Sequence, residues 1–241
     1  MSRNRAVYEE ALRIVDRAAE LGHPVRLAGS VGVFAHSPSA DAAYDAAGRT
    51  LADIDLVTRG NVKSTDVDAL MAEFGFAPYT HHNVWHAEIR QMFDRDDGVH
   101  VDVFRDELNF NHPIALKRRL DADRPTIPLV ELLLSKLQIV EATPKDMQDI
   151  VLLAGDHELG PGADELDADA VADTLAGDWG FWYTATANVE KARSQADGQA
   201  AEQLAELARR IDQRPKSSRW KMRAKVGPRL RWYQEVEEAQ R

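Results

Sequence analysis

The chain has 241 residues, a formal net charge of −10 at pH 7 and no cysteine. Its length allows one large domain or two small ones, and 44% hydrophobic residues are enough for a buried core. The lack of cysteine excludes disulfides and cysteine-based zinc sites, and the negative charge argues against nucleic-acid binding over the whole surface. No apolar run approaches the roughly 18 residues of a membrane span, and we find no signal peptide, so we expect a cytoplasmic protein without membrane contact.

Helices and strands alternate over the first part of the chain. Residues 5–21 have the periodicity of an amphipathic helix that ends at Gly22. A buried strand is predicted at 25–28, followed by a helix at 30–35 and a loop with some helix at 36–48. The Gly-Ser corner between that strand and that helix is either an ordinary turn or a cradle for phosphate.

A second strand and a second long helix follow. The sequence "LADIDLVTRG" predicts a strand closed by Gly60, and residues 64–75 predict a helix. Ser64 or Thr65 can cap this helix, and Gly75 can end it.

A β-rich region is predicted at 76–104, and its end is typical of a hairpin with Asp-Asp-Gly (96–98) at the turn. Within it, His81, His82 and His86 form the only histidine-rich stretch, which we expect in a solvated hairpin or loop. A metal-dependent phosphohydrolase usually needs clusters of histidine and aspartate, so this class is disfavoured.

From Pro128 onward the pattern is almost entirely helical. Apolar periodicity predicts helices at 128–141, 145–155, 167–177, 180–196, 199–212 and from 217 to the end, with a break at Gly227-Pro228. We therefore expect an α+β fold, with a mixed β-sheet and flanking helices at 1–115 and an all-α region at 116–241.

Three aspartates interrupt the apolar strands. Side chains alternate along a strand, so Asp53 and Asp55 share one face, and His100 and Asp102 share a face of a later strand. Like charges side by side repel, and a divalent cation with oxygen ligands is a natural compensation. The aspartates are therefore either metal ligands or solvated acids on exposed strands, and His100 is either a supporting group or an ordinary strand histidine.

One lysine falls on an apolar helical stripe. In "IPLVELLLSKLQIV", Lys136 has the spacing of the buried leucines, so it must extend to solvent or meet a fixed anion. Ten residues later, Asp146 and Asp149 share a helix face, either as an exposed acidic pair or as part of a site.

The C-terminal segment is basic, with ten lysines and arginines and one acid between Arg209 and Arg231. Trp220, Trp232 and Tyr233 lie among or beside these cations. Stacking combined with phosphate contacts is a common way to hold single-stranded RNA. The alternative is a charged helix that packs on the acidic part of the chain, with the aromatic rings in its packing.

Together these motifs resemble the nucleotidyltransferase superfamily of DNA polymerase β type, and more closely its AbiEii/AbiGii-like branch, which includes toxins of toxin–antitoxin pairs. The stretches "GRTLADIDLVT" and "LLLSKLQIVEATPKDMQDIVLL" carry the likeness, which covers residues 25–155. Two features depart from the family pattern: the stretch between Ser30 and Asp53 is longer than usual, and Thr50 lies one place off its usual position.

The resemblance implies an enzyme of the EC 2.7.7 type that moves an NMP from an NTP, for instance ATP, to an acceptor hydroxyl. Asp53 and Asp55 would bind two Mg²⁺ ions, and Asp102 would bind the second ion and help to deprotonate the acceptor. Gly29 and Ser30 would cradle the β- and γ-phosphates.

By the same resemblance, Lys136 would contact the triphosphate, and Asp146 and Asp149 are candidates for the nucleotide site. The acceptor is open: an RNA or tRNA end held by the basic segment 209–231, a protein side chain or a small molecule. A cognate antitoxin is a possible partner. The alternative function is an inactive nucleotide-binding or interaction module with the same fold.

Overall fold

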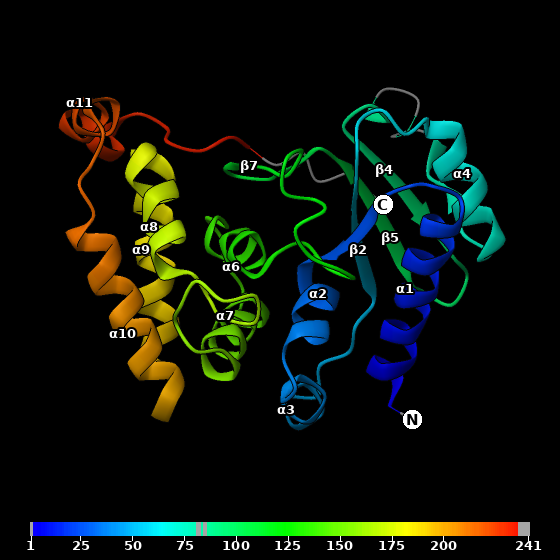
Figure 1. Cartoon of the computed structure of the whole chain (residues 1–241), viewed down its shortest axis with the longest axis horizontal. Coiled ribbons are helices and arrows are strands. Elements are labelled where there is room, and N and C mark those ends of the chain that lie inside the picture. Colours follow the sequence, from blue (N-terminus) through cyan, green and yellow to red (C-terminus); the bar gives the residue numbers. More distant parts are fainter. Residues whose placement is uncertain (1, 81–82, 84–85, 236–241) are drawn as a thin grey trace. The chain divides into compact units, whose positions relative to one another are not determined.

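The computed structural model describes residues 2–80, 83 and 86–235, and these form two compact units (Figure 1). Of the described residues, unit 1 comprises those up to 108 together with 115–128, and unit 2 comprises 109–114 and 129–235. Unit 1 contains a five-stranded mixed sheet, and unit 2 is helical. The predicted α+β class is thereby confirmed.

The sheet of unit 1 has the strand order β1-β2-β5-β4-β3. The strands are β1 (Val25–Ala28), β2 (Asp53–Thr58), β3 (Ala77–Pro78), β4 (Arg90–Asp94) and β5 (His100–Arg105). Strands β2 and β5 are parallel, and the other neighbours are antiparallel. Strands β4 and β5 form the predicted hairpin, and Gly98 in its turn has a φ of 78°. Strand β2 therefore carries its side chains between those of β1 and β5.

The helices of unit 1 whose bounds lie in the described residues are α1 (Arg3–Glu20), α2 (Gly29–His36), α3 (Ala40–Ala46) and α4 (Ser64–Glu73). Helices α1 and α4 pack together on one side of the sheet (Figure 1). The predicted helix starts and stops are close to these bounds, because they depend on local signals such as Gly22, which has a φ of 78°. The region expected as a loop at 36–48 is largely helix α3.

The predicted cap of α4 is wrong. Lys63 is the N-cap residue and makes no side-chain hydrogen bond, so neither Ser64 nor Thr65 occupies the capping position. The histidine-rich stretch is described only in part: His81 and His82 lie outside the described residues, and His86 is helical rather than in a loop.

Residues 106–128 leave the sheet and return to it. A two-stranded sheet is formed by β6 (Glu107–Asn109) and β7 (Pro113–Ala115). Further along, Thr126 bridges Leu27 of β1, with backbone hydrogen bonds of 2.9 Å on either side of the bridge. Residues 125–127 therefore pair with the edge of the sheet at β1.

Unit 2 is a bundle of α6 (Leu129–Leu137), α7 (Pro144–Asp156), α8 (Ala168–Gly177), α9 (Trp179–Arg193), α10 (Gly198–Gln213) and α11 (Ser218–Val226). Helix α10 packs on α7, α8 and α9. Polar caps explain several starts: Thr143, Asp167, Asp178 and Ser217 each accept a hydrogen bond from a backbone N–H of the helix that follows. Helix α11 ends at Gly227, where the break was predicted.

Candidate functional site

The strand register brings the three predicted aspartates to one face of the sheet. Asp53 of β2 pairs with His100 of β5, and Asp55 pairs with Asp102 two residues along. Neighbouring strands lie about 4.8 Å apart, so Asp55 and Asp102 are direct neighbours. Asp53 is exposed, Asp55 is partly exposed and Asp102 is buried. The predicted juxtaposition of these carboxylate-bearing positions therefore exists.

Gly29 stands directly against this acidic face. It follows Ala28, the register partner of Asp55, and it has a φ of 55°. A Cβ atom built at position 29 would lie 1.9 Å from Oδ2 of Asp55. Glycine is thus required here twice, by the left-handed backbone and by the carboxylate that occupies the space of a side chain.

Helix α2 begins at this glycine. Its N-cap residue, Ala28, makes no side-chain hydrogen bond to the first turn. The first N–H groups of a helix carry partial positive charge and are ready donors to an anion. The Gly-Ser corner therefore combines a helix start with a close carboxylate, which an ordinary turn does not need.

Arg49 is a further member of the site. It belongs to the motif "GRTLADIDLVT", but the motif by itself gave it no role. Its guanidinium donates a 2.6 Å hydrogen bond to Oγ of Ser30 and lies 4.0 Å from the centre of the Tyr44 ring. Arg49 is only 7% exposed. A buried cation thus fixes the Ser30 hydroxyl beside the acidic face. The sequence signal that could have pointed to Arg49 is its position directly after a glycine, Gly48. In the structure Gly48 has a φ of 61°.

Arg90 is the second cation that sequence reasoning missed. One of its Nη atoms lies 2.6 Å from Oδ2 of Asp102, and its guanidinium lies 5.1 Å from the centre of the Phe104 ring. On the same face, Nδ1 of His100 lies 2.6 Å from Oδ1 of Asp94. His100 is therefore paired with a cross-strand acid.

The carboxylates of Asp53, Asp55 and Asp102 have the donor type and the position that a divalent cation needs. Asp102, however, is paired with Arg90 in this structure. Carboxylate oxygens are suitable ligands for Mg²⁺. Within the described part of the chain, however, no three His, Asp or Glu side chains are grouped as a metal-ligand set. Asp102 meets Arg90 instead, so an ion at this face has to replace Arg90 as the counter-charge of Asp102.

The other three predicted residues form a cluster in unit 2. Nζ of Lys136 lies 2.8 Å from Oδ2 of Asp149 and 3.5 Å from Oδ1 of Asp146. Lys136 is 7% exposed and Asp149 is fully buried. Asp146 also completes a capping box with Thr143 at the start of α7. The sequence allowed two interpretations of Lys136, an extension to solvent or a contact with a fixed anion. The structure shows the fixed anion, and it is the carboxylate of Asp149. The expected contact of Lys136 with a triphosphate stays a prediction.

The basic C-terminal segment divides into two parts. Arg209, Arg210 and Arg214 pair with acids of unit 2, among them Glu206 and Asp173. These pairs match the interpretation of a charged helix packed on acidic neighbours. The cations of α11 and of the tail after it are different, since this helix has no buried residue.

No protein-family model matches this chain, and no curated protein is similar enough to it to count as a relative. Among the described helices, none is long and apolar enough to cross a membrane. The nucleotidyltransferase interpretation therefore depends on the residues and their geometry.

Proposed function

We propose that unit 1 is the core of a Mg²⁺-dependent nucleotidyltransferase that moves an NMP from an NTP to an acceptor hydroxyl. One observation carries the proposal: Asp55 lies in register beside Asp102, and its carboxylate occupies the side-chain space of Gly29 at the start of a helix. Clustered carboxylates beside an uncapped helix start match the needs of a metal-bound triphosphate.

Each group has a role that follows from its position. Asp53, Asp55 and Asp102 would hold the metal, and the N–H groups at the start of α2 would donate to phosphate oxygens. The Ser30 hydroxyl, held by Arg49, can donate its own proton to the same anion. Bound Mg²⁺ supplies charge neutralisation at the attacking and leaving oxygens.

The reaction balances without a further reagent. The acceptor oxygen bonds to the α-phosphorus, the bond from that phosphorus to the bridging oxygen breaks, and pyrophosphate leaves. The proton of the acceptor hydroxyl passes to a carboxylate, for which Asp102 is the candidate. Arg90 compensates the charge of Asp102 in this structure, and a metal held by Asp102 would take over that compensation.

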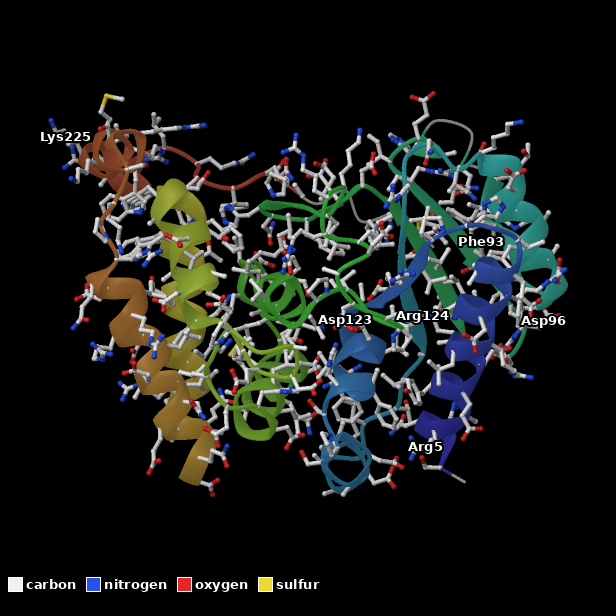
Figure 2. The ribbon with its side chains drawn as sticks, in the orientation of Figure 1. Arg5, Phe93, Asp96, Asp123, Arg124 and Lys225 are labelled. Atoms are coloured by element: carbon white, nitrogen blue, oxygen red, sulfur yellow. The ribbon has the colours of Figure 1, made fainter. Side chains whose placement is uncertain are left out.

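Transfer of label from α-labelled NTPs tests the proposal. The full chain is incubated with Mg²⁺ and each NTP, and label is followed into total RNA, into the protein itself and into small hydroxyl compounds. We expect Asp55→Asn to lower transfer about 100-fold or more, the scale of removing a key transition-state charge. Asp96→Asn is the matched control, because Asp96 is an exposed aspartate of the β4–β5 turn (Figure 2).

Two results contradict the proposal: no transfer by the unaltered chain to any of these acceptors, or equal transfer by Asp55→Asn. A binding module without catalysis is the second candidate function. It is favoured by the internal compensation of the charges, since Arg90 neutralises Asp102 and two aspartates neutralise Lys136. In that case Mg²⁺ and NTP raise the melting temperature of the chain, Asp55→Asn lowers this shift, and no label is transferred.

A further inference from the structure

A separate pocket lies within unit 2, with a volume of about 360 Å³. Its lining includes three arginines and three aromatic side chains: Arg219, Arg223, Arg231, Trp179, Trp232 and Tyr233. The volume is at the lower end of the range of small-molecule sites. A ligand of roughly one nucleotide fits this size better than a long chain segment.

The tail that follows α11 forms one wall of the pocket and is held by specific contacts. A Cβ atom at Gly180 of α9 would lie 2.4 Å from the carbonyl oxygen of Trp232, so the tail approaches α9 as closely as glycine allows. Nε1 of Trp232 donates to Oγ1 of Thr184 at 3.0 Å. Asn111 and Gln234 exchange two further hydrogen bonds, of 3.0 and 3.1 Å. The wall is therefore a built part of unit 2.

The pocket carries an excess of positive charge. Among the lining residues that the structure describes, Asp178 is the only acid, and it is occupied in capping α9. Glu235, next to the lining residue Gln234, pairs with Arg231 at 2.7 Å. Arg223 donates to the carbonyl oxygens of Gly227 and Leu230, so it stabilises the tail. Arg219 is exposed and has no hydrogen-bond or ion-pair partner among the residues that the structure describes. An arginine fork without a partner is well suited to a phosphate.

The aromatic rings give the pocket a second kind of contact. Trp179 stacks on Tyr183 with 5.0 Å between ring centres, and Trp232 meets Tyr183 and Tyr233 edge-on. Rings held in this way offer flat apolar surface on which the base of a planar ligand can stack.

His112 completes the lining without adding charge. It is buried, its ring stacks on Phe181 at 5.0 Å, and Nε2 lies 3.0 Å from Oγ1 of Thr184. Burial lowers the pKa of His112 to about 4, so this ring is neutral at pH 7. The positive charge of the pocket comes from the arginines, which keep it at any physiological pH.

We propose that this pocket binds one nucleoside phosphate, with the phosphate on Arg219, where it also competes with Glu235 for Arg231, and the base against the aromatic rings. The ligand is a free mononucleotide or the terminal nucleotide of an RNA, because both present the same phosphate and base. The site lies wholly within unit 2, so it does not depend on catalysis by unit 1.

Binding to the full chain in EDTA tests this proposal. The probes are AMP, adenosine, inorganic phosphate and a short single-stranded RNA, followed by calorimetry and by tryptophan fluorescence. We expect AMP to bind at least about tenfold more tightly than adenosine or phosphate alone, because both contacts are needed. An RNA that binds more tightly than AMP and depends equally on Arg219 identifies the RNA end as the ligand. Binding of AMP alone identifies a free nucleotide.

Matched variants connect the binding to the pocket. Arg219→Gln should weaken AMP binding about tenfold, the scale of one charge-assisted hydrogen bond. Arg229→Gln and Lys225→Gln remove one exposed charge each from residues outside the pocket lining, and they should leave affinity unchanged; Figure 2 labels Lys225 on α11. Asp55→Asn should also leave it unchanged.

Three results overturn the proposal. One is the absence of binding by both AMP and RNA. Another is phosphate that binds as tightly as AMP, since this would indicate an anion site without base contacts. The third is AMP affinity that falls in Asp55→Asn but not in Arg219→Gln, which would assign the binding to unit 1.

Discussion

The two acidic clusters of this protein compensate their charge in different ways. In unit 2, Lys136 is buried against Asp149, so the cluster is closed and neutralised from within. In unit 1, Asp53 is exposed and Asp55 partly exposed, and Asp102 pairs with Arg90 at 2.6 Å. Asp149 of unit 2 is therefore buried and neutralised from within, whereas Asp53 and Asp55 of unit 1 reach solvent.

The largest expected effect comes from breaking the buried ion pair of Lys136 and Asp149 in unit 2. Asp149→Asn leaves Lys136 as a buried cation with only the more distant Asp146, so we expect a loss of about 3–5 kcal/mol in the free energy of unfolding. Urea denaturation measures it. Lys136→Met combined with Asp149→Leu should recover most of the loss, because no buried charge remains. A loss below about 1 kcal/mol in Asp149→Asn would show that this pair is unimportant for stability.

The Gly29 contact is the corresponding test in unit 1. Gly29→Ala forces a left-handed alanine and a collision with the Asp55 carboxylate, for an expected loss of about 3 kcal/mol. Gly48→Ala is the control, because Gly48 has a φ of 61° and nothing within 4 Å of the added Cβ. It should lose only about 1 kcal/mol. Equal losses in the two variants would mean that the carboxylate does not constrain position 29.

The buried histidine of unit 2 predicts a pH dependence. Burial lowers the pKa of folded His112 to about 4, whereas an unfolded histidine titrates near 6.5. Between these values the unfolded chain binds the proton and the folded chain does not, so stability is lost as pH falls. We expect about 2 kcal/mol between pH 6.5 and 5. The difference between unaltered chain and His112→Gln in urea titrations isolates this contribution, and parallel pH profiles would contradict it.

The smallest effect is a change in Mg²⁺ affinity at the strand aspartates of unit 1, and it depends on the proposed metal site. Arg90 competes with a cation for Asp102, so Arg90→Gln should bind Mg²⁺ several-fold more tightly, by about 1 kcal/mol. A Mg²⁺ titration followed by melting temperature measures this change. Arg59→Gln removes a more exposed arginine paired with Asp121 and should have no effect on the titration. Weaker Mg²⁺ binding in Arg90→Gln would mean that Arg90 supports the metal rather than competing with it.

Local signals accounted for most of the fold. The strand at 25–28, the hairpin turn at Gly98 and the helix ends follow from periodicity, glycines and turns, which act over a few residues. The cap of α4 was mispredicted because the helix already begins at Ser64, so both hydroxyl residues lie inside it and Lys63 is at the N-cap position. The region 36–48 was expected as a loop because its alanine-rich pattern lacks an apolar period, although alanine favours helix.

The sequence by itself determined the elements and, through strand alternation, the common face of Asp53 and Asp55. Only the tertiary structure decided the partners: Arg90 for Asp102, Arg49 for Ser30 and Asp149 for Lys136. Alternation and helix period are properties of neighbouring residues, whereas the counter-charge of a buried group depends on which distant segments pack against it. The arginine pocket arises in the same way, since a tail near the end of the chain returns to the start of α9.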